Sequence, residues 1–193
     1  MVEGLIAAGG RSQRTGEQYK MLLDLEGRTL IERAVAPMES WCSRIIVVTG
    51  HRGHLLRPVL ETWSKVEMVD NRDYDQGMFS SIKTGLPLIT AERFFFLPGD
   101  YPLVSSWVYQ ALLEVDAPVV VPAYQGRTGH PVLFRSTAID DILSQPNTAT
   151  LRDYVIRQKP YILDVDCPGI LIDIDTMEDY QQAKVWLAAQ GGL

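Results

Sequence analysis

A glycine-rich stretch near the N-terminus carries the first set of residues that could do chemistry. It follows an apolar run that ends in Ala7 and Ala8, and it combines glycines, a hydroxyl and three cations. These residues are Gly9, Gly10, Arg11, Ser12, Arg14, Gly16 and Lys20. Glycine allows positive φ and a close approach of the backbone to a ligand. Backbone amides and cations just beyond a strand bind phosphate groups, so this stretch predicts a polyphosphate site.

The spacing of this stretch excludes two well-known phosphate loops. The chain contains neither G-x-G-x-x-G nor G-x-x-x-x-G-K-[ST], so it has no Rossmann dinucleotide fingerprint and no Walker A loop. Taken alone, the stretch also fits a surface turn with solvated arginines. The rest of the chain has to distinguish these two interpretations.

Acidic residues form a second set, and the first of them is Asp100. It follows the most apolar run of the chain, 93–97, and lies in a segment with glycine and proline, 98–102. A carboxylate at the end of a buried strand is partly desolvated, which is unfavourable unless it is paired or binds a metal. A plain turn aspartate is the alternative, because aspartate and proline are both common in turns.

Asp173 and Asp175 are the other acidic candidates. They flank Ile174 at the end of the last predicted strand, and we expect only one of them to face the site squarely. Asp175 also fits the start of a helix together with Thr176, where capping alone would explain either residue. Metal binding and capping are both retained as interpretations of Asp175.

Two further segments hold polar residues in a predicted loop or at a predicted helix start. They are Asn71, Gly77, Ser80 and Ser81 in the first segment, and Gly129 and His130 in the second. Amides and hydroxyls at a helix start bind anions or sugar hydroxyls, although Ser80 could equally be an ordinary helix residue. His130 is either a substrate contact or, as is more common for a lone histidine in a turn, structural.

Composition limits the partners and the compartment. The chain has 193 residues and a net charge of −6, so a nucleic-acid surface, which needs a basic face, is not expected. Cys42 and Cys167 are far apart, so neither a disulfide framework nor a zinc site is expected, and the compartment is predicted to be reducing. No run approaches the roughly 18 apolar residues of a membrane span, and no signal peptide is recognisable, so we expect a cytoplasmic protein away from membranes.

Alternating strands and helices must position these residues. Strands are predicted at 2–7, 44–49, 66–69, 93–97, 118–122, 132–135, 161–165 and 169–173. Helices are predicted after Thr29 and at 54–63, 78–86, 106–115, 136–145, 150–158 and 176–189. The alternation predicts a three-layer α/β sandwich with a mostly parallel, Rossmann-like sheet in one domain, 1–193. Ligands bind beyond the carboxyl ends of such strands, so loops 8–20, 71–81 and 98–102 are expected on one edge.

Taken together, the motifs resemble the MobA-like NTP transferase family, most of all its molybdenum cofactor cytidylyltransferase branch. The matches are Ala7–Gly16 with Lys20, Asn71 with 77–82, and the segments 97–102, 126–134 and 173–179. They span nearly the whole chain in the family's order. Five ordered motifs are far more specific than any one of them.

The resemblance implies a fold of the nucleotide-diphospho-sugar transferase type and transfer of CMP from CTP to the terminal phosphate of molybdopterin, with release of pyrophosphate. Catalytic roles are implied for Lys20, Arg14 and Asp100. The implied nucleotide-binding residues are Ala7, Ala8, Gly9, Gly10, Arg11, Ser12, Lys20, Asn71, Gly77, Ser80, Ser81, Gly99 and Asp100. The implied acceptor-binding residues are Tyr101, Gly129 and His130. Asp100, Asp173 and Asp175 would hold Mg²⁺, with Mn²⁺ as an alternative, and a molybdoenzyme or cofactor chaperone is the implied partner.

Three positions bear on specificity. Thr15 stands where the family usually has methionine, and Tyr101 where it often has glutamine or methionine. Neither change removes a charge, so activity is expected to survive, but Tyr101 leaves the acceptor open. Ala8 favours the cytidylyl over the guanylyl branch. The alternatives are use of GTP or another NTP, a sugar or alcohol phosphate as acceptor, and a non-catalytic nucleotide- or cofactor-binding protein.

Overall fold

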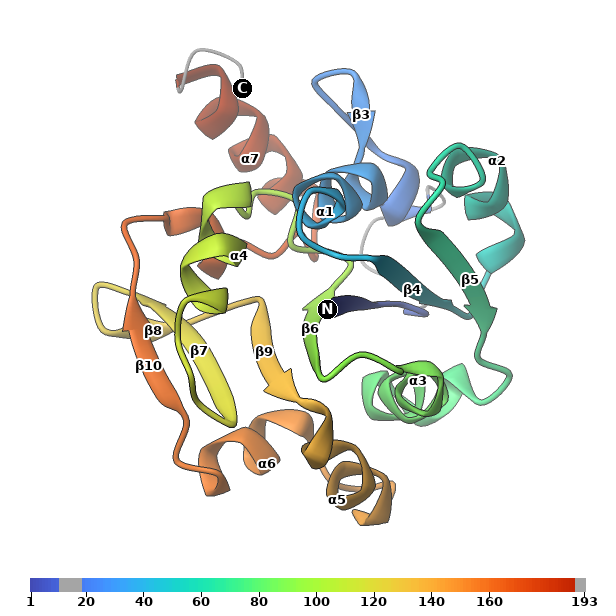
Figure 1. Cartoon of the computed structure of the whole chain (residues 1–193). Helices are drawn as coiled ribbons and strands as arrows, with labels where there is room; N and C mark the ends of the chain where they lie inside the picture. Colours follow the sequence, from blue (N-terminus) through green and yellow to red (C-terminus); the bar gives the residue numbers. More distant parts are fainter. Residues whose placement is uncertain (11–18, 190–193) are drawn as a thin grey trace.

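A mostly parallel sheet forms the centre of the molecule. The structure is a computed structural model that describes residues 1–10 and 19–189 (Figure 1). The strands of the sheet are β1 (Val2–Ala8), β4 (Arg44–Thr49), β5 (Val66–Asp70), β6 (Arg93–Pro98), β7 (Val119–Tyr124), β8 (Arg127–Thr128), β9 (Val132–Arg135) and β10 (Tyr161–Asp164). Their order is β10-β7-β9-β6-β1-β4-β5, with β8 paired to β7. Only β8 and β9 run antiparallel to their neighbours, and β2 (Asp24–Leu25) and β3 (Arg28–Thr29) form a separate ribbon.

Helices cover both faces of the sheet, which confirms the predicted three-layer α/β architecture. The α-helices are α1 (Leu30–Glu39), α2 (Arg57–Leu60), α3 (Met78–Gly85), α4 (Ser106–Leu113), α5 (Ile139–Ser144), α6 (Leu151–Arg157) and α7 (Met177–Ala189). Short 3₁₀ helices are η2 (Lys20–Leu22), η3 (Gly53–Leu56), η4 (Tyr74–Gln76), η5 (Leu86–Leu88), η6 (Ser136–Ala138) and η7 (Pro168–Leu171). Figure 1 shows α1 and α4 on one face and α3, α5 and α6 on the other.

The central strands bury side chains on both faces. Along β6, Phe95 and Leu97 pack under α1 and α4, whereas Phe94 and Phe96 pack against α3, α5 and α6. Because successive side chains of a strand point to opposite faces, a strand covered on both sides reads as a continuous apolar run. This explains why the strands around β1 and β6 are predictable from the sequence.

Two predicted elements differ from the structure. Residues 169–173 do not form a strand, because the chain makes the 3₁₀ helix η7 there, and Pro168 suits the first turn of a helix. Ile170 is fully buried there and Leu171 and Ile172 are partly buried, so a short apolar run misled the prediction. The predicted helix 54–63 is η3 followed by α2, in which Leu56 and Leu60 are buried and Leu55 is exposed.

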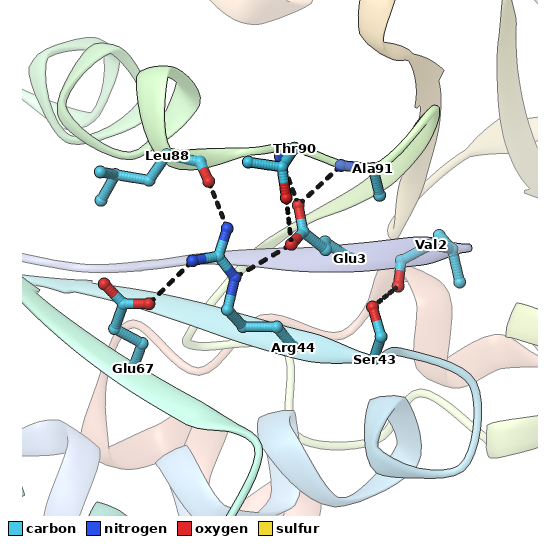
Figure 2. Close-up of polar contacts among 8 residues, drawn as sticks. All are labelled: Val2, Glu3, Ser43, Arg44, Glu67, Leu88, Thr90 and Ala91. Atoms are coloured by element: carbon cyan, nitrogen blue, oxygen red, sulfur yellow. Dashed lines mark hydrogen bonds and ion pairs between the residues drawn. The ribbon is translucent and has the colours of Figure 1, made fainter.

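A buried carboxylate ties the strand starts together at the end of the sheet where β1 and β4 begin (Figure 2). Glu3 accepts hydrogen bonds from the amides of Thr90 (2.7 Å) and Ala91 (3.1 Å) and from Arg44 Nε (2.9 Å). Arg44 also bonds to Glu67 and to the Leu88 carbonyl. Burial raises the pKa of Glu3, but these hydrogen bonds and the Arg44 charge outweigh it and hold the pKa below its usual value. The network is therefore a stabilising element remote from the strand ends that matter for ligands.

No helix in residues 1–10 and 19–189 has the length and apolar character needed to cross a membrane.

Candidate active site

The carboxyl ends of β1 and β6 meet in a pair of neighbouring turns. The Gly99 amide donates a hydrogen bond to the Ala7 carbonyl at 2.9 Å, so the turn after β6 lies against the end of β1. A Cβ on Gly9 would come within 2.9 Å of Ser81 Oγ, whereas a Cβ on Gly10 would meet no described atom within 4 Å. Gly9 is therefore needed for close packing, and Gly10 is exposed at the cavity that opens beyond the turn.

This first cavity has a volume of about 560 Å³ and receives side chains from distant parts of the chain. Its lining includes Ala7, Gly9, Gly10, Lys20, Met21, Tyr74, Asp75, Gly77, Met78, Ser81, Pro98, Asp100, Tyr101, His130, Asp173 and Asp175. The expectation that the loops after three strands converge on one sheet edge is thus confirmed. Of the residues predicted for the site, Ala8 and Gly99 lie behind this lining, where Gly99 would place a Cβ 3.3 Å from Ala8 Cβ.

Lys20 lies at the centre of the acidic residues. Its side chain is buried, and Nζ lies 2.9 Å from Asp100 Oδ2 and 3.0 Å from Asp175 Oδ1. Burial lowers the pKa of Lys20, but the two carboxylates outweigh this effect, so the pKa lies above its usual value and the side chain is an ammonium. We call Lys20, Asp100 and Asp175 the Lys20 triad.

Asp173 and Asp175 both line the cavity, so the expectation that only one of them faces it is wrong. Alternate residues of an extended chain lie on the same side, and here Ile174 between them is fully buried on the other side. The Ile174 amide donates to the Asp100 carbonyl at 2.9 Å, which fixes the two acidic segments relative to each other. Burial raises the pKa of Asp173, and the charges of Asp100 and Asp175 raise it further.

The start of α7 is capped without the side chain of Asp175. Asp179 Oδ2 accepts from the amides of Asp175 (3.1 Å) and Thr176 (2.7 Å), and the Asp179 amide donates to Thr176 Oγ1 at 3.1 Å. Thr176 and Asp179 thus form the reciprocal pair of a capping box. Capping therefore does not account for Asp175, whose carboxylate pairs with Lys20 instead.

Asn71 and Ser80 support the wall of the cavity. Asn71 is buried, and its side-chain amide donates to Ser80 Oγ (2.8 Å) and Ser81 Oγ (3.1 Å). Ser80 Oγ in turn donates to the carbonyls of Asp73 and Gly77, so both residues shape the turn at Gly77, which has a φ of +92°. Within the part of the chain described, Gly77 and Ser81 line the cavity, whereas the buried Asn71 and the partly exposed Ser80 do not.

Tyr101 and His130 separate the first cavity from a second one of about 1300 Å³. Their rings meet edge to face with centroids 4.7 Å apart, and His130 also lies edge-on to Phe96. Burial lowers the pKa of His130 to about 4, so its ring is neutral at neutral pH, and burial with the nearby aspartates raises the pKa of Tyr101. Tyr101, His130, Gly77, Met78 and Asp173 line both cavities, so the two adjoin at these residues.

The second cavity has mainly apolar walls with a polar rim. Phe79, Phe96, Val121, Val155, Ile162 and Ile170 contribute the apolar surface, and Gly129, Arg127 and Arg152 also line it. A Cβ on Gly129 would come within 2.2 Å of the Ile170 carbonyl oxygen, so this glycine is required by packing as well. Sequence reasoning did not single out Tyr74, Asp75, Arg127 or Arg152, although the first two lie in the predicted loop 71–81 and Arg127 in the matched segment 126–134.

The described lining of the first cavity is acidic. It contains one lysine against Asp75, Asp100, Asp173 and Asp175, so a polyanion cannot bind there without added positive charge. Arg11, Ser12 and Arg14, which the sequence assigns to phosphate binding, lie outside the described residues, as does Thr15. A divalent cation is the other source of positive charge that such a ligand brings with it.

The residues present fit a divalent cation. Asp100 Oδ1 is buried and has no hydrogen-bond partner among the described residues, and the pKa of Asp173 is raised first by burial and then by the charges of the neighbouring aspartates. Within residues 1–10 and 19–189, no group of three or more acidic, histidine or cysteine side chains forms a complete metal-binding site. Mg²⁺ needs only one or two carboxylates when phosphate oxygens complete its coordination, so Asp100 with Asp173 or Asp175 suffices.

Comparison with known proteins agrees with this geometry. The family model of the MobA-like NTP transferase domain matches residues 4–161. The chain is 30% identical over 184 residues to the molybdenum cofactor cytidylyltransferase of Escherichia coli, covering 95% of both chains.

Solved structures share the fold over almost the whole chain. A nucleotidyl transferase from a Methanothermobacter species superposes with a TM-score of 0.86 at 23% identity, covering 98% of this chain and 99% of that one. A Mycobacterium tuberculosis protein in complex with manganese superposes with a TM-score of 0.79 at 21% identity, covering 95% and 98%. The chain therefore belongs to the MobA-like NTP transferase family and is a nucleotidyltransferase.

Proposed function

We propose that this chain transfers CMP from CTP to the terminal phosphate of a molybdopterin-type cofactor and releases pyrophosphate. The observation that carries the proposal is the meeting of the Gly9-Gly10 turn, Lys20 and Asp100 at the carboxyl ends of adjacent parallel strands. The relationship over 95% of the chain to a molybdenum cofactor cytidylyltransferase supports the choice of nucleotide and acceptor.

The nucleotide is assigned to the first cavity. The turn of Gly9 and Gly10 offers backbone amides at a strand end, and Gly10 leaves room for a ligand to approach the backbone. Lys20 provides a buried ammonium for the phosphates, and Arg11, Ser12 and Arg14 are proposed to complete the phosphate-binding loop. Gly77 and Ser81 are proposed as direct contacts, with Asn71 and Ser80 holding them in place.

The acceptor is assigned to the second cavity. It adjoins the first cavity at Tyr101, His130 and Asp173, so an acceptor phosphate would lie next to the nucleotide while the rest of the molecule stays in the larger space. The apolar walls suit a flat ring system, and Arg127 and Arg152 supply cations at its lining. Neutral His130 and protonated Tyr101 favour hydrogen bonding over charge pairing with the acceptor.

The proposed chemistry needs alignment and charge neutralisation more than proton transfer. The acceptor phosphate is already ionised near neutral pH, so in-line attack on the α-phosphorus of CTP requires no general base. Lys20 and the loop cations would neutralise the departing pyrophosphate, where negative charge develops. Asp100 with Asp173 or Asp175 would hold Mg²⁺, or Mn²⁺ in its place, and the bound ion would neutralise phosphate oxygens.

A substrate matrix tests the proposal. The purified protein is incubated with Mg²⁺ and with CTP, GTP, ATP or UTP, each with molybdopterin and separately with sugar or alcohol phosphates, and pyrophosphate release is measured. We expect release with CTP and molybdopterin, and a cytidylylated product by mass spectrometry. Equal or faster turnover with GTP or with a sugar phosphate would contradict the proposed specificity. Tight binding of nucleotide with no pyrophosphate from any pair would indicate a binding protein instead.

The proposal extends to the setting of the enzyme. The single nucleotidyltransferase domain would work in the cytoplasm and pass its product to a molybdoenzyme or a cofactor chaperone. Fluorescence microscopy of a tagged chain, together with co-purification with a molybdoenzyme, tests both statements. Failure to recover any molybdoenzyme under conditions that retain product would contradict the direct hand-over.

A further inference from the structure

The ammonium of Lys20 lies in the position that a cation bridging two carboxylates would take. Nζ is 2.9 Å from Asp100 Oδ2 and 3.0 Å from Asp175 Oδ1, and only 7% of the residue is exposed. The three residues come from η2, the turn after β6 and the start of α7. Lys20 thus neutralises acidic groups that are far apart in the sequence.

The two carboxylates are held near each other by more than Lys20. The Ile174 amide bonds to the Asp100 carbonyl, and the Asp175 amide bonds to Asp179 Oδ2. Both are backbone anchors that do not involve the lysine. Withdrawal of Lys20 would therefore leave the acidic groups in place with less positive charge beside them.

Among the described residues, the acidic cluster is short of positive charge even with Lys20 in place. Asp100 Oδ1 is buried without a described partner, and Asp173 lies in the same cavity. A divalent ion carries twice the charge of an ammonium and prefers carboxylate oxygens. The ion and the ammonium repel each other at such short range, so both cannot bind the same two carboxylates well.

We propose that Lys20 is the resident counter-ion of the metal site and that a divalent cation competes with it for Asp100 and Asp175. The inference rests on the proposed function in that the cation arrives with the triphosphate. On exchange, the ammonium is released toward the phosphates, where the incoming negative charge receives it. Metal and nucleotide binding are then cooperative, because the metal displaces Lys20 from the carboxylates and the phosphates of the nucleotide attract the released ammonium.

Titration of Mn²⁺ without nucleotide tests the competition. Binding is measured by calorimetry on the wild-type chain, on Lys20→Gln, and on Lys65→Gln as a matched control, because the Lys65 ammonium bonds to the Glu39 carbonyl outside both cavities. We expect the Kd of Lys20→Gln to fall at least about tenfold, because a unit positive charge next to the carboxylates is removed. Lys65→Gln should bind Mn²⁺ as the wild type does. An unchanged or weaker affinity in folded Lys20→Gln would overturn the proposal.

A second measurement uses only the wild-type chain, so it does not depend on whether a variant folds. The buried Lys20 ammonium of the wild-type chain is followed in a lysine side-chain ¹⁵N NMR spectrum during titration with Mg²⁺ alone. We expect its signal to shift or broaden as the ion binds, and an unchanged signal at saturating Mg²⁺ would show that ion and lysine coexist. Neither measurement contains CTP or acceptor, so the exchange can fail while cytidylyl transfer is observed, and the reverse.

Discussion

The Ile174 amide and the Asp100 carbonyl form a 2.9 Å hydrogen bond that joins the tip of β6 to the segment leading into α7. This bond positions three aspartates by their backbone rather than by their side chains. Replacing one carboxylate should therefore change the chemistry of the site without moving its neighbours.

Asp100→Asn should reduce turnover by about 10²–10³-fold, the effect of losing one group that stabilises developing charge. The fold should persist, because the backbone bond to Ile174 remains. Pyrophosphate release measures the first expectation and circular dichroism the second. Asp140→Asn, an exposed change in α5 outside both cavities, is the matched control. Wild-type turnover in Asp100→Asn would contradict the role of this carboxylate.

Glu3→Gln should lower the free energy of unfolding by about 1–3 kcal/mol, because it weakens a buried acceptor of four hydrogen bonds. The network lies at the strand starts, so kcat should stay unchanged. Glu67→Gln removes a more exposed partner of Arg44 and should cost at most about 1 kcal/mol. Urea denaturation of both variants compares them, and equal losses would contradict the special role of Glu3.

Acid should weaken the wild-type fold through Glu3. The folded-state pKa of Glu3 lies below the ordinary value of 4.5, so its stabilising contribution is fully present above that pH. The contribution is lost as the pH falls through the folded-state pKa. The stability difference between wild type and Glu3→Gln should therefore shrink progressively below about pH 4.5, as urea denaturation at several pH values would show. A constant difference down to pH 3 would count against the depressed pKa.

His130 should remain neutral throughout the working range of the enzyme. Its pKa is lowered to about 4 from an ordinary value of 6.5, so the unfolded chain binds more protons between these values. The contribution of His130 to stability is thus favourable above 6.5 and declines as the pH falls toward 4. NMR titration of the imidazole carbons should show no protonation between about pH 5.5 and 8, and a midpoint near 6.5 would refute the burial argument.

Gly129→Ala should destabilise the fold by about 1–3 kcal/mol, because the new methyl group would collide with backbone atoms of Ile170, and displacing backbone atoms is energetically unfavourable. The displaced turn should also raise the KM for the acceptor. Gly10→Ala is the control, since no described atom lies within 4 Å of its Cβ, and its unfolding free energy should match the wild type. Thermal unfolding measures both, and a stable Gly129→Ala would show that the turn can relax.

The sequence was sufficient to predict the sheet and the edge where ligands bind. Strands such as β6 are covered on both faces, so their apolar runs are continuous, and a parallel sheet dictates that their carboxyl ends meet. The prediction of a strand over the apolar run at 169–172 was wrong, because a short apolar segment that packs in a 3₁₀ helix has the composition of a strand.

The ion-pair and hydrogen-bond partners of the site residues were harder to predict than the identity of the residues themselves. Lys20 and Asp100 could both be assigned to the site, but no spacing rule indicates that one ammonium joins Asp100 to Asp175. Asn71 and Ser80 carried the right chemistry for ligand binding, yet their hydrogen bonds support the turn at Gly77. The second cavity is assembled from residues between 76 and 173, and the sequence indicated only the part of its lining that lies in the matched segments, among them 97–102 and 126–134.

The direction of β9 places part of the site on a hairpin of its own. Because β9 runs antiparallel to β6 and β7, the chain reaches the ligand edge at the end of β7, turns at 125–131 and runs back along β9. That hairpin tip carries His130, whereas Gly10, Lys20 and Asp100 come from the turn after β1, from η2 and from the turn after β6. A substitution in the tip can therefore reshape the boundary between the two cavities while the backbone that places the glycine turn, the lysine and the aspartate stays as it is.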